Sequence, residues 1–324
     1  MGRRKRRKLP APAVVTSSPV PPPAPWIDLP DDLTANILQR LDPKEIFESA
    51  QIVCTTWRRV CKDPATWRVL DLNYRYYDSA HRKFETICRC AVDRSQGQLV
   101  ELTVTAFGED RLLNYVADRS SKLRRLTLVD YAIFGESFVE VMKKLPQLEE
   151  LHLIGTIFIG PEDIEIIGIS CPMLKSFTYN EPRRVTPDIF EDLWDYDNTI
   201  PNELGVVIGK TMPNLRCLRI LDQRMNNKGL EAILDGCPHL KSLDLRQCSG
   251  LELQEWDCLG KRCSKQMKDL RLPSDSTIDL DWLTTNPFEC DDVDWDELLS
   301  NSRMVDVFDF SYWKQNSDSD SDYD

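Results

Sequence analysis

Apolar residues recur along the middle of the chain in one six-residue pattern, apolar-x-x-apolar-x-apolar. The copies are LVELTV from Leu99, LRRLTL from Leu123, LEELHL from Leu148, LKSFTY from Leu174, LRCLRI from Leu215, LKSLDL from Leu240 and a weaker MKDLRL from Met267. Successive copies start 24, 25, 26, 41, 25 and 27 residues apart. A period of this length is typical of repeat proteins, and the alternating apolar residues predict a short strand in each copy.

A helical pattern leads into the predicted strands. The segments LLNYVADRSSKL, FVEVMKKLPQL, DIEIIGISCPML, LGVVIGKTMPNL and LEAILDGCPHL carry apolar residues at helical spacing. In four of them a proline stands two residues before the strand pattern and is expected to end the helix: Pro146, Pro172, Pro213 and Pro238. One strand and one helix cannot bury their own apolar faces, so the units are predicted to stack into a curved parallel sheet with helices outside.

Residues 26–72 show a different pattern, which predicts three short helices. The first is expected to begin at Pro30 and to carry on one face Leu33, Ile37, Leu38 and Leu41. Asp42-Pro43-Lys44-Glu45 predicts an N-cap, a proline at the first position and a capping box for the second helix. A third apolar stripe is formed by Ile52, Val53, Trp57 and Val60. About 45 residues is near the lower limit for independent folding, so this unit is expected to pack on an attached domain or a partner.

Charge is segregated along the chain, whose net charge is −12. The first ten residues hold six Lys or Arg, and residues 291–324 hold eleven Asp or Glu against Arg303 and Lys314. Disordered segments are predicted at 1–25, which is basic and then Pro-rich, and at 314–324, where serines alternating with Asp are typical of phosphorylation sites. The basic run from Arg3 to Lys8 indicates a nuclear localisation signal more than a nucleic-acid arm, because the body is acidic.

No apolar run approaches the roughly 18 residues of a membrane helix, and no signal peptide is recognisable. A soluble protein of the nucleus or cytoplasm is therefore expected, with no membrane partner. In a reducing compartment its eleven cysteines are not expected to form disulfides. CxxC pairs are absent and only three histidines are scattered through the chain, so buried thiols are favoured over a metal site. No cofactor loop or catalytic spacing is recognisable, and the chain is not expected to be an enzyme.

The periodic segments resemble cysteine-containing leucine-rich repeats over roughly residues 67–275. The matching residues are Cys171, Pro172 and Leu174, and then Cys237, Pro238, Leu240, Leu243, Leu245 and Cys248. In this resemblance Cys248 occupies the inward Asn or Cys position, so Cys237 and Cys248 are expected to lie in the core. The resemblance implies an α/β fold with a right-handed strand–helix solenoid over residues 73–290. Residues 291–313 are expected to form a C-terminal cap or extension.

Residues 26–72 resemble an F-box. The resemblance rests on Leu29-Pro30, Leu33, Ile37, Leu41, Val53-Cys54, Trp57-Arg58 and Trp67, with small departures at Asp31-Asp32 and Thr55-Thr56. It implies that the chain, which looks plant-like, is the substrate-recognition subunit of a Skp–cullin–RING ubiquitin ligase. Adaptor-binding residues are then expected to be Leu29, Pro30, Leu33, Ile37, Leu41, Val53, Cys54, Trp57 and Trp67. The alternatives are that these residues only cap the solenoid, or that the chain is a scaffold without ligase function.

The same resemblance places the target protein on the solenoid's concave face, to which the x residues of each strand contribute. The residues expected there are Glu101, Thr103, Arg125, Thr127, Glu150, His152, Ser176, Thr178, Cys217, Arg219, Ser242, Asp244 and Arg246, which extends the strand of LKSLDL. Their mixed signs do not indicate nucleic-acid binding. The long repeat inserts about 15 residues in the segment 180–204, where Trp194 and Tyr196 are candidate anchors. A solvated surface and a loop packed on the solenoid's edge are the alternatives.

Overall fold

The computed structural model describes residues 29–74, 81–106, 110–131, 135–156, 159–180, 202–251, 253 and 258–280. The basic and Pro-rich segment, the C-terminal extension and the acidic tail lie outside these residues. So does nearly all of the 180–204 insertion, including the two candidate anchors Trp194 and Tyr196.

Three short helices open the described chain, as the sequence predicts. They are α1 (Asp31–Leu38), α2 (Pro43–Glu48) and α3 (Thr55–Val60). The 3-10 turn η2 (Ala50–Ile52) lies between α2 and α3, and the 3-10 turn η3 (Pro64–Trp67) follows α3. The predicted capping box of α2 is present. Asp42 Oδ1 accepts from the Lys44 N–H at 2.7 Å, and the Asp42 N–H donates to Glu45 Oε2 at 3.2 Å.

The four apolar residues in and just after α1 do not share one face, and that prediction was wrong. Thr34 and Leu38 form the buried row of this helix, whereas Leu33 and Ile37 are exposed. Residues four apart lie on one row of a helix, and neighbouring residues are turned by about 100°. The four apolar residues therefore divide between an inner row and an outer row, and α1 keeps apolar side chains on its outer surface.

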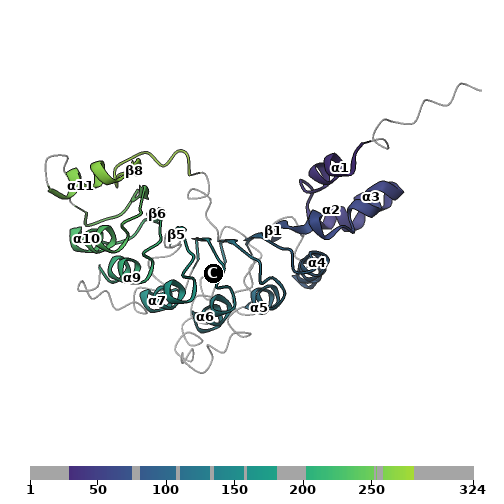
Figure 1. The fold of residues 1–324 in the computed structure, drawn as a ribbon, viewed down its shortest axis with the longest axis horizontal. Coiled ribbons are helices and arrows are strands. Elements are labelled where there is room, and N and C mark those ends of the chain that lie inside the picture. The colour runs from purple at the N-terminus through teal and green to yellow at the C-terminus, as the bar shows by residue number, and fades with distance from the viewer. Residues whose placement is uncertain are drawn as a thin grey trace, which may run out of the picture.

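Eight parallel strands form a single sheet in sequential order (Figure 1). They are β1 (Val69–Asn73), β2 (Glu101–Thr105), β3 (Arg125–Val129), β4 (Glu150–Ile154), β5 (Ser176–Asn180), β6 (Cys217–Leu221), β7 (Ser242–Asp244) and β8 (Asp269–Arg271). The seven periodic segments correspond to β2 through β8. Strand β1 precedes them in the sheet and follows directly on η3, so the N-terminal helices join the sheet through its first strand.

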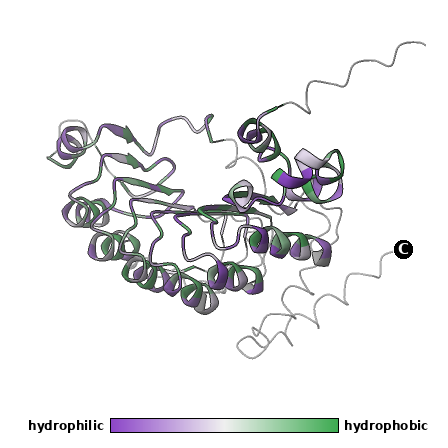
Figure 2. Cartoon of the chain, turned by 45° about the vertical axis from the view of Figure 1, so that its right-hand side comes forward, coloured by the Kyte–Doolittle hydropathy of each residue, from purple (hydrophilic) through white to green (hydrophobic). Residues whose placement is uncertain are grey.

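The helices between the strands cover the outer side of the curved sheet (Figure 1). They are α4 (His81–Arg94), α5 (Asp110–Arg119), α6 (Gly135–Lys143), α7 (Pro161–Ser170), α9 (Glu203–Thr211), α10 (Asn227–Gly236) and α11 (Cys258–Gln266). Each carries both hydrophobic and hydrophilic residues (Figure 2), and the apolar strand residues between sheet and helices, such as Leu102, Leu151 and Leu218, are fully buried. The predicted α/β architecture, short helices followed by a strand–helix solenoid, is confirmed.

Left-handed residues directly follow strands β2, β3, β4 and β6 and extend the sheet's hydrogen bonding. Asp130 (φ 50°) donates its N–H to the Ile154 carbonyl at 2.8 Å, and Gly155 (φ 62°) donates to the Asn180 carbonyl at 3.0 Å. Only Gly155 lacks a side chain among these turn residues, because a Cβ there would lie 2.6 Å from Asp130 Oδ1. At equivalent places in successive repeats, a residue with positive φ thus forms one more inter-strand hydrogen bond, and this bond offsets the backbone strain.

The repeat cysteines lie in the core, as predicted. Cys171, Cys237 and Cys248 are all buried. The Sγ atoms of Cys171 and Cys237 lie 3.7 Å and 3.4 Å from carbonyl oxygens at the end of the preceding repeat's helix segment, those of Leu145 and Met212. Burial raises the pKa of Cys237 to about 11 and those of Cys171 and Cys248 to about 12. The thiols therefore link neighbouring repeats in their protonated form.

These raised pKa values predict slow alkylation of the buried thiols at pH 8. The thiolate is the reactive species, and with a pKa of about 11 to 12 it is a minor species at that pH. In the native protein, iodoacetamide should modify exposed Cys90 and Cys258 at least about a hundredfold faster than Cys171, Cys237 and Cys248. Peptide mass spectrometry over time measures these rates, and similar rates at all five sites would contradict the packing.

Candidate protein-binding surfaces

The N-terminal helices expose a set of apolar side chains. Leu33 is 50% exposed and Ile37 37% on α1, while Ile52 is 76% and Val53 61% exposed beyond α2. Pro30, at the N-cap of α1, is also exposed, and Leu29 is half-buried. Exposed aliphatic side chains gathered on one small unit are typical of a protein-binding surface. The sequence pattern places Ile52 in an apolar stripe but not among the adaptor residues. Its 76% exposure depends on the break between η2 and α3, which the pattern does not show.

The other predicted adaptor residues face inward. Trp67 is buried, and its indole Nε1–H donates to the Cys61 carbonyl at 2.8 Å. Leu41 and Trp57 are half-buried against the core. Cys54 caps α3, its Sγ accepting from the Trp57 N–H at 3.4 Å. The structure thus separates the predicted set into outward residues and residues that hold the three helices together.

Arg94, from the end of α4, joins the N-terminal helices to the first repeat. Its guanidinium lies 4.5 Å from the ring centre of Phe47 and 5.5 Å from that of Trp67. It also donates to the Cys61 carbonyl and to Gln51 Oε1, both at 3.0 Å. Two ring contacts and two hydrogen bonds from one rigid group seat these helices on α4 in a defined orientation.

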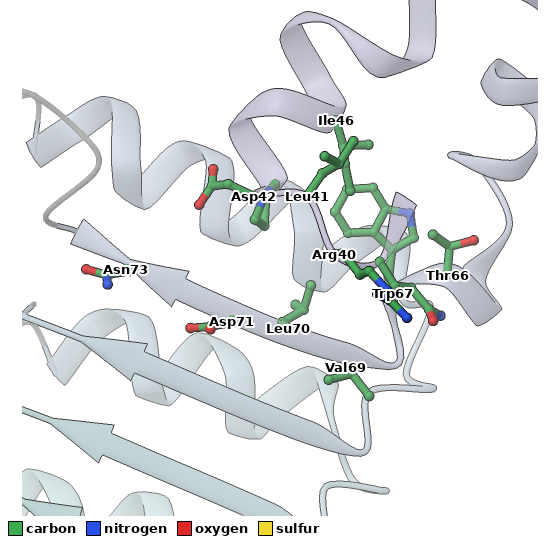
Figure 3. Close-up of a pocket in the computed structure, with 12 residues that line it drawn as sticks. Arg40, Leu41, Asp42, Ile46, Thr66, Trp67, Val69, Leu70, Asp71 and Asn73 are labelled. Atoms are coloured by element: carbon green, nitrogen blue, oxygen red, sulfur yellow. The ribbon is translucent and has the colours of Figure 1, made fainter. Parts of the chain in front are cut away.

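A hollow of about 300 Å³ lies where these helices meet β1 (Figure 3). Its apolar lining is Leu41, Ile46, Trp67, Val69 and Leu70, with Arg40, Asp42 and Asp71 among the polar residues. Burial, and secondarily the charge of Asp42, raises the pKa of Asp71. The hollow marks where the N-terminal helices end and the inner face of the sheet begins.

Two rows of mostly polar residues run across the inner face of the sheet, as the strand pattern predicts, but Thr178 and Asp244 within them are buried and not exposed as expected. In register, the first row is Glu101, Arg125, Glu150, Ser176, Cys217 and Ser242, and the second is Thr103, Thr127, His152, Thr178, Arg219 and Asp244. Arg125 Nε donates to Glu101 Oε2 at 2.9 Å across the strands. The rows place acidic and basic groups side by side, with Glu150 at the start of β4 and Arg219 in the middle of β6.

His152 lies near the middle of this face. Its Nδ1 is 2.8 Å from Thr178 Oγ1, and its Nε2 is 3.8 Å from Glu150 Oε2. Burial lowers the pKa of His152, although the charge of Glu150 opposes the shift. The imidazole is therefore mainly neutral at pH 7, and it offers a hydrogen-bonding group to this face more than a charge.

Arg246 does not belong to the exposed inner face, and the prediction that it faces outward there was wrong. Its side chain is buried between β7 and the segment after β8, and Nη1 donates to the Ser276 carbonyl at 2.8 Å. Nη2 and Nε donate to the buried carboxylate of Asp244 at 2.7 and 2.9 Å. Nη1 also pairs with the Asp279 carboxylate. These hydrogen bonds raise the pKa of Arg246 further. Ser276 and Asp279 lie 30 and 33 residues away from Arg246 in the sequence, so the strand pattern does not reveal these contacts.

No group of three or more His, Cys, Asp or Glu in the described part of the chain is placed to hold a metal ion. Across the same residues, no helix combines the length and the apolar character needed to cross a membrane.

This chain is similar to several known proteins. The F-box-like family model matches residues 26–73. F-box/LRR-repeat protein 23 of Arabidopsis thaliana is 43% identical over 253 residues, which are 78% of this chain and 54% of that protein, so the match spans about half of this relative. F-box protein SKIP19 of Arabidopsis thaliana is 39% identical over 92% of this chain and 93% of its own length. A solved structure, the Rad7 and Elc1 complex in yeast, aligns at 14% identity with a TM-score of 0.40, over 70% of this chain and 56% of that one.

Proposed function

Because this chain belongs to the F-box/LRR-repeat protein family, we propose that it is the substrate-recognition subunit of a Skp–cullin–F-box ubiquitin ligase. The N-terminal helices bind a Skp-type adaptor, which connects the chain to the cullin and RING subunits. The solenoid binds the protein to be modified. The chain performs no bond chemistry itself, and the complex acts in the nucleus or the cytoplasm.

The observation that carries this proposal is the outward apolar set on the N-terminal helices, formed by Leu33, Ile37, Ile52 and Val53. Apolar anchors on short helices suit a contact in which helices enter a groove of the partner. Leu33, Ile37 and Val53, with Leu29 and Pro30, are therefore assigned to the adaptor contact. Leu41, Cys54, Trp57 and Trp67 act indirectly, because they keep the helices in position.

The inner face of the sheet is the proposed site for the target protein. Its rows combine Glu101, Arg125, Glu150, His152 and Arg219, which suit a polar partner surface with charges of both signs. Catalysis in such a complex is positional, since a target lysine held near the ubiquitin-loaded enzyme reacts at a high effective concentration. The contacts of Arg94 serve this role by fixing the adaptor-binding helices relative to the target-binding sheet.

Leu33→Asp tests the adaptor contact. The side chain is half exposed in the first turn of α1. The helix dipole stabilises an acidic residue there, so folding should be retained. Loss of a hot-spot contact costs about 2 kcal/mol, which corresponds to roughly 30-fold weaker binding. Titration calorimetry with a purified Skp-family adaptor measures this effect on the full chain.

Ile169→Asp is the matched control, because Ile169 is 66% exposed on α7, far from the N-terminal helices in the sequence. It should bind the adaptor like the wild-type chain. If the wild-type chain binds no Skp-family adaptor, the ligase proposal fails and a scaffold role remains. Equal weakening by both substitutions would show that the outward face of α1 is not the contact.

A further inference from the structure

A row of basic residues lies on one edge of the solenoid, outside the surfaces used in the proposed function. Lys175, Arg216, Lys241 and Lys268 each stand immediately before a strand, and together they are called the basic edge. The N–H groups of Arg216, Lys241 and Lys268 each donate to the carbonyl of the preceding member, at 2.7, 2.8 and 2.7 Å. Since neighbouring strands are about 4.8 Å apart, the backbone holds these four residues at a fixed, short spacing.

Acidic partners are present at one end of this row only. Glu149, which occupies the equivalent position in the previous repeat, pairs with Lys175 at 2.6 Å and also with Arg124. Arg216, Lys241 and Lys268 are exposed, and none of them has an acidic partner among the residues that the structure describes. Like charges one strand apart repel by about 1 kcal/mol even in water. The last three repeats thus present an unbalanced positive row, which an anionic ligand would stabilise.

The basic edge borders a hollow of about 360 Å³. Lys175, Arg216 and Lys241 line it together with Met173, Asn214 and His239, which come from the turns just before the same three strands. Asn214 Nδ2 already donates to the Pro172 carbonyl at 3.0 Å. The charged groups around the hollow are cationic, and no carboxylate lines it. Its length across three repeats suits an extended acidic segment more than a single small anion.

We infer that the basic edge binds the chain's own acidic segment SDSDSDYD, residues 317–324. Asp318, Asp320 and Asp322 alternate with other residues in the sequence, and alternate side chains of an extended segment point to the same side, so a segment bound in extended form would present these carboxylates to the row together. The described chain ends at Leu280, shortly after β8 and Lys268. The 36 residues from 281 to 316 are long enough to reach from Leu280 back to the basic edge. A tether of this kind gives an effective concentration near the millimolar range.

An intramolecular ligand is favoured over nucleic acid by the overall charge. The net charge of −12 repels a polyanion that must approach as a long strand, whereas the segment is already attached. Binding of the segment neutralises the row and covers the hollow. The inference does not depend on ubiquitin ligase function, and its test uses the purified chain without any adaptor, so the two can fail separately.

Zero-length cross-linking tests the contact in the full chain. A carbodiimide condenses a carboxylate with a lysine amine that touches it, and mass spectrometry of the monomer identifies the joined residues. The expected links join Asp318–Asp324 to Lys241 and Lys268, and they should be lost in 0.5 M NaCl, where charges are screened within a few ångströms. Links spread over lysines elsewhere, or links found only between two copies, would overturn the inference.

A pair of matched variants tests the row itself. Arg216→Glu with Lys241→Glu and the control Lys62→Glu with Lys228→Glu change the net charge equally, and all four side chains are exposed. With residues 315–324 deleted, a fluorescent peptide of that sequence should bind the edge variant about tenfold more weakly than the control. Equal binding by both variants would overturn the inference. So would tighter, edge-dependent binding of a single-stranded RNA oligonucleotide, which would identify a nucleic-acid site instead.

Discussion

Gly236→Ala is expected to lower the free energy of unfolding by about 3 kcal/mol. Gly236 ends α10, and a Cβ built there lies 1.9 Å from the carbonyl oxygen of Gly209 and 2.3 Å from its carbonyl carbon, both in α9. The obstacle is backbone, so no side-chain rotation relieves it. Helix propensity alone favours alanine over glycine by at most about 1 kcal/mol. Overlap between two packed helices therefore outweighs propensity, and the substitution destabilises.

Urea denaturation followed by circular dichroism measures this effect. Gly160→Ala is the matched control, because a Cβ at Gly160 meets its nearest atom, Asp163 Oδ2, at 3.9 Å and the residue has a negative φ. The control should change stability by less than about 1 kcal/mol. A Gly236→Ala variant as stable as the control would show that α9 and α10 are not in such close contact.

Arg246→Met is expected to cost about 3 to 5 kcal/mol, through a different mechanism. Methionine has a similar length but cannot pair with Asp244, whose carboxylate is buried at the end of β7. An uncompensated charge then remains in the interior, and the bonds to Ser276 and Asp279 are lost as well. The segment after β8 should detach first, because Arg246 is its main polar link to β7.

Hydrogen exchange measured by mass spectrometry locates this loss. Faster exchange is expected in residues 269–280 of Arg246→Met, with little change in α4 to α6. The double variant Arg246→Met with Asp244→Leu removes the stranded charge and should recover part of the stability, since an apolar pair can replace a buried ion pair. A double variant less stable than the single one would refute this account of the pair.

Local patterns in the sequence predict much of the fold. The spacing of the leucines predicts strands β2 to β8, and Asp42 with Glu45 predicts the start of α2. The expected burial of Cys237 and Cys248 is confirmed as well. These features depend on residues within one repeat or one helical turn, where burial or a cap is recorded in the periodicity of the chain. The assignment of individual residues to adaptor or target binding stays a prediction.

Other properties were decided only when distant segments came together. The apolar residues of α1 divide between inside and outside because α3 and η3 cover one row and leave the other exposed. Arg246 is internal because residues near Ser276 fold back over it. Of the basic residues on the edge, Lys175 is neutralised and Lys241 is not, because Glu149 reaches only the former. Periodicity reports whether a position is apolar, but exposure and charge pairing depend on neighbours about 25 or more residues away, which only the tertiary structure supplies.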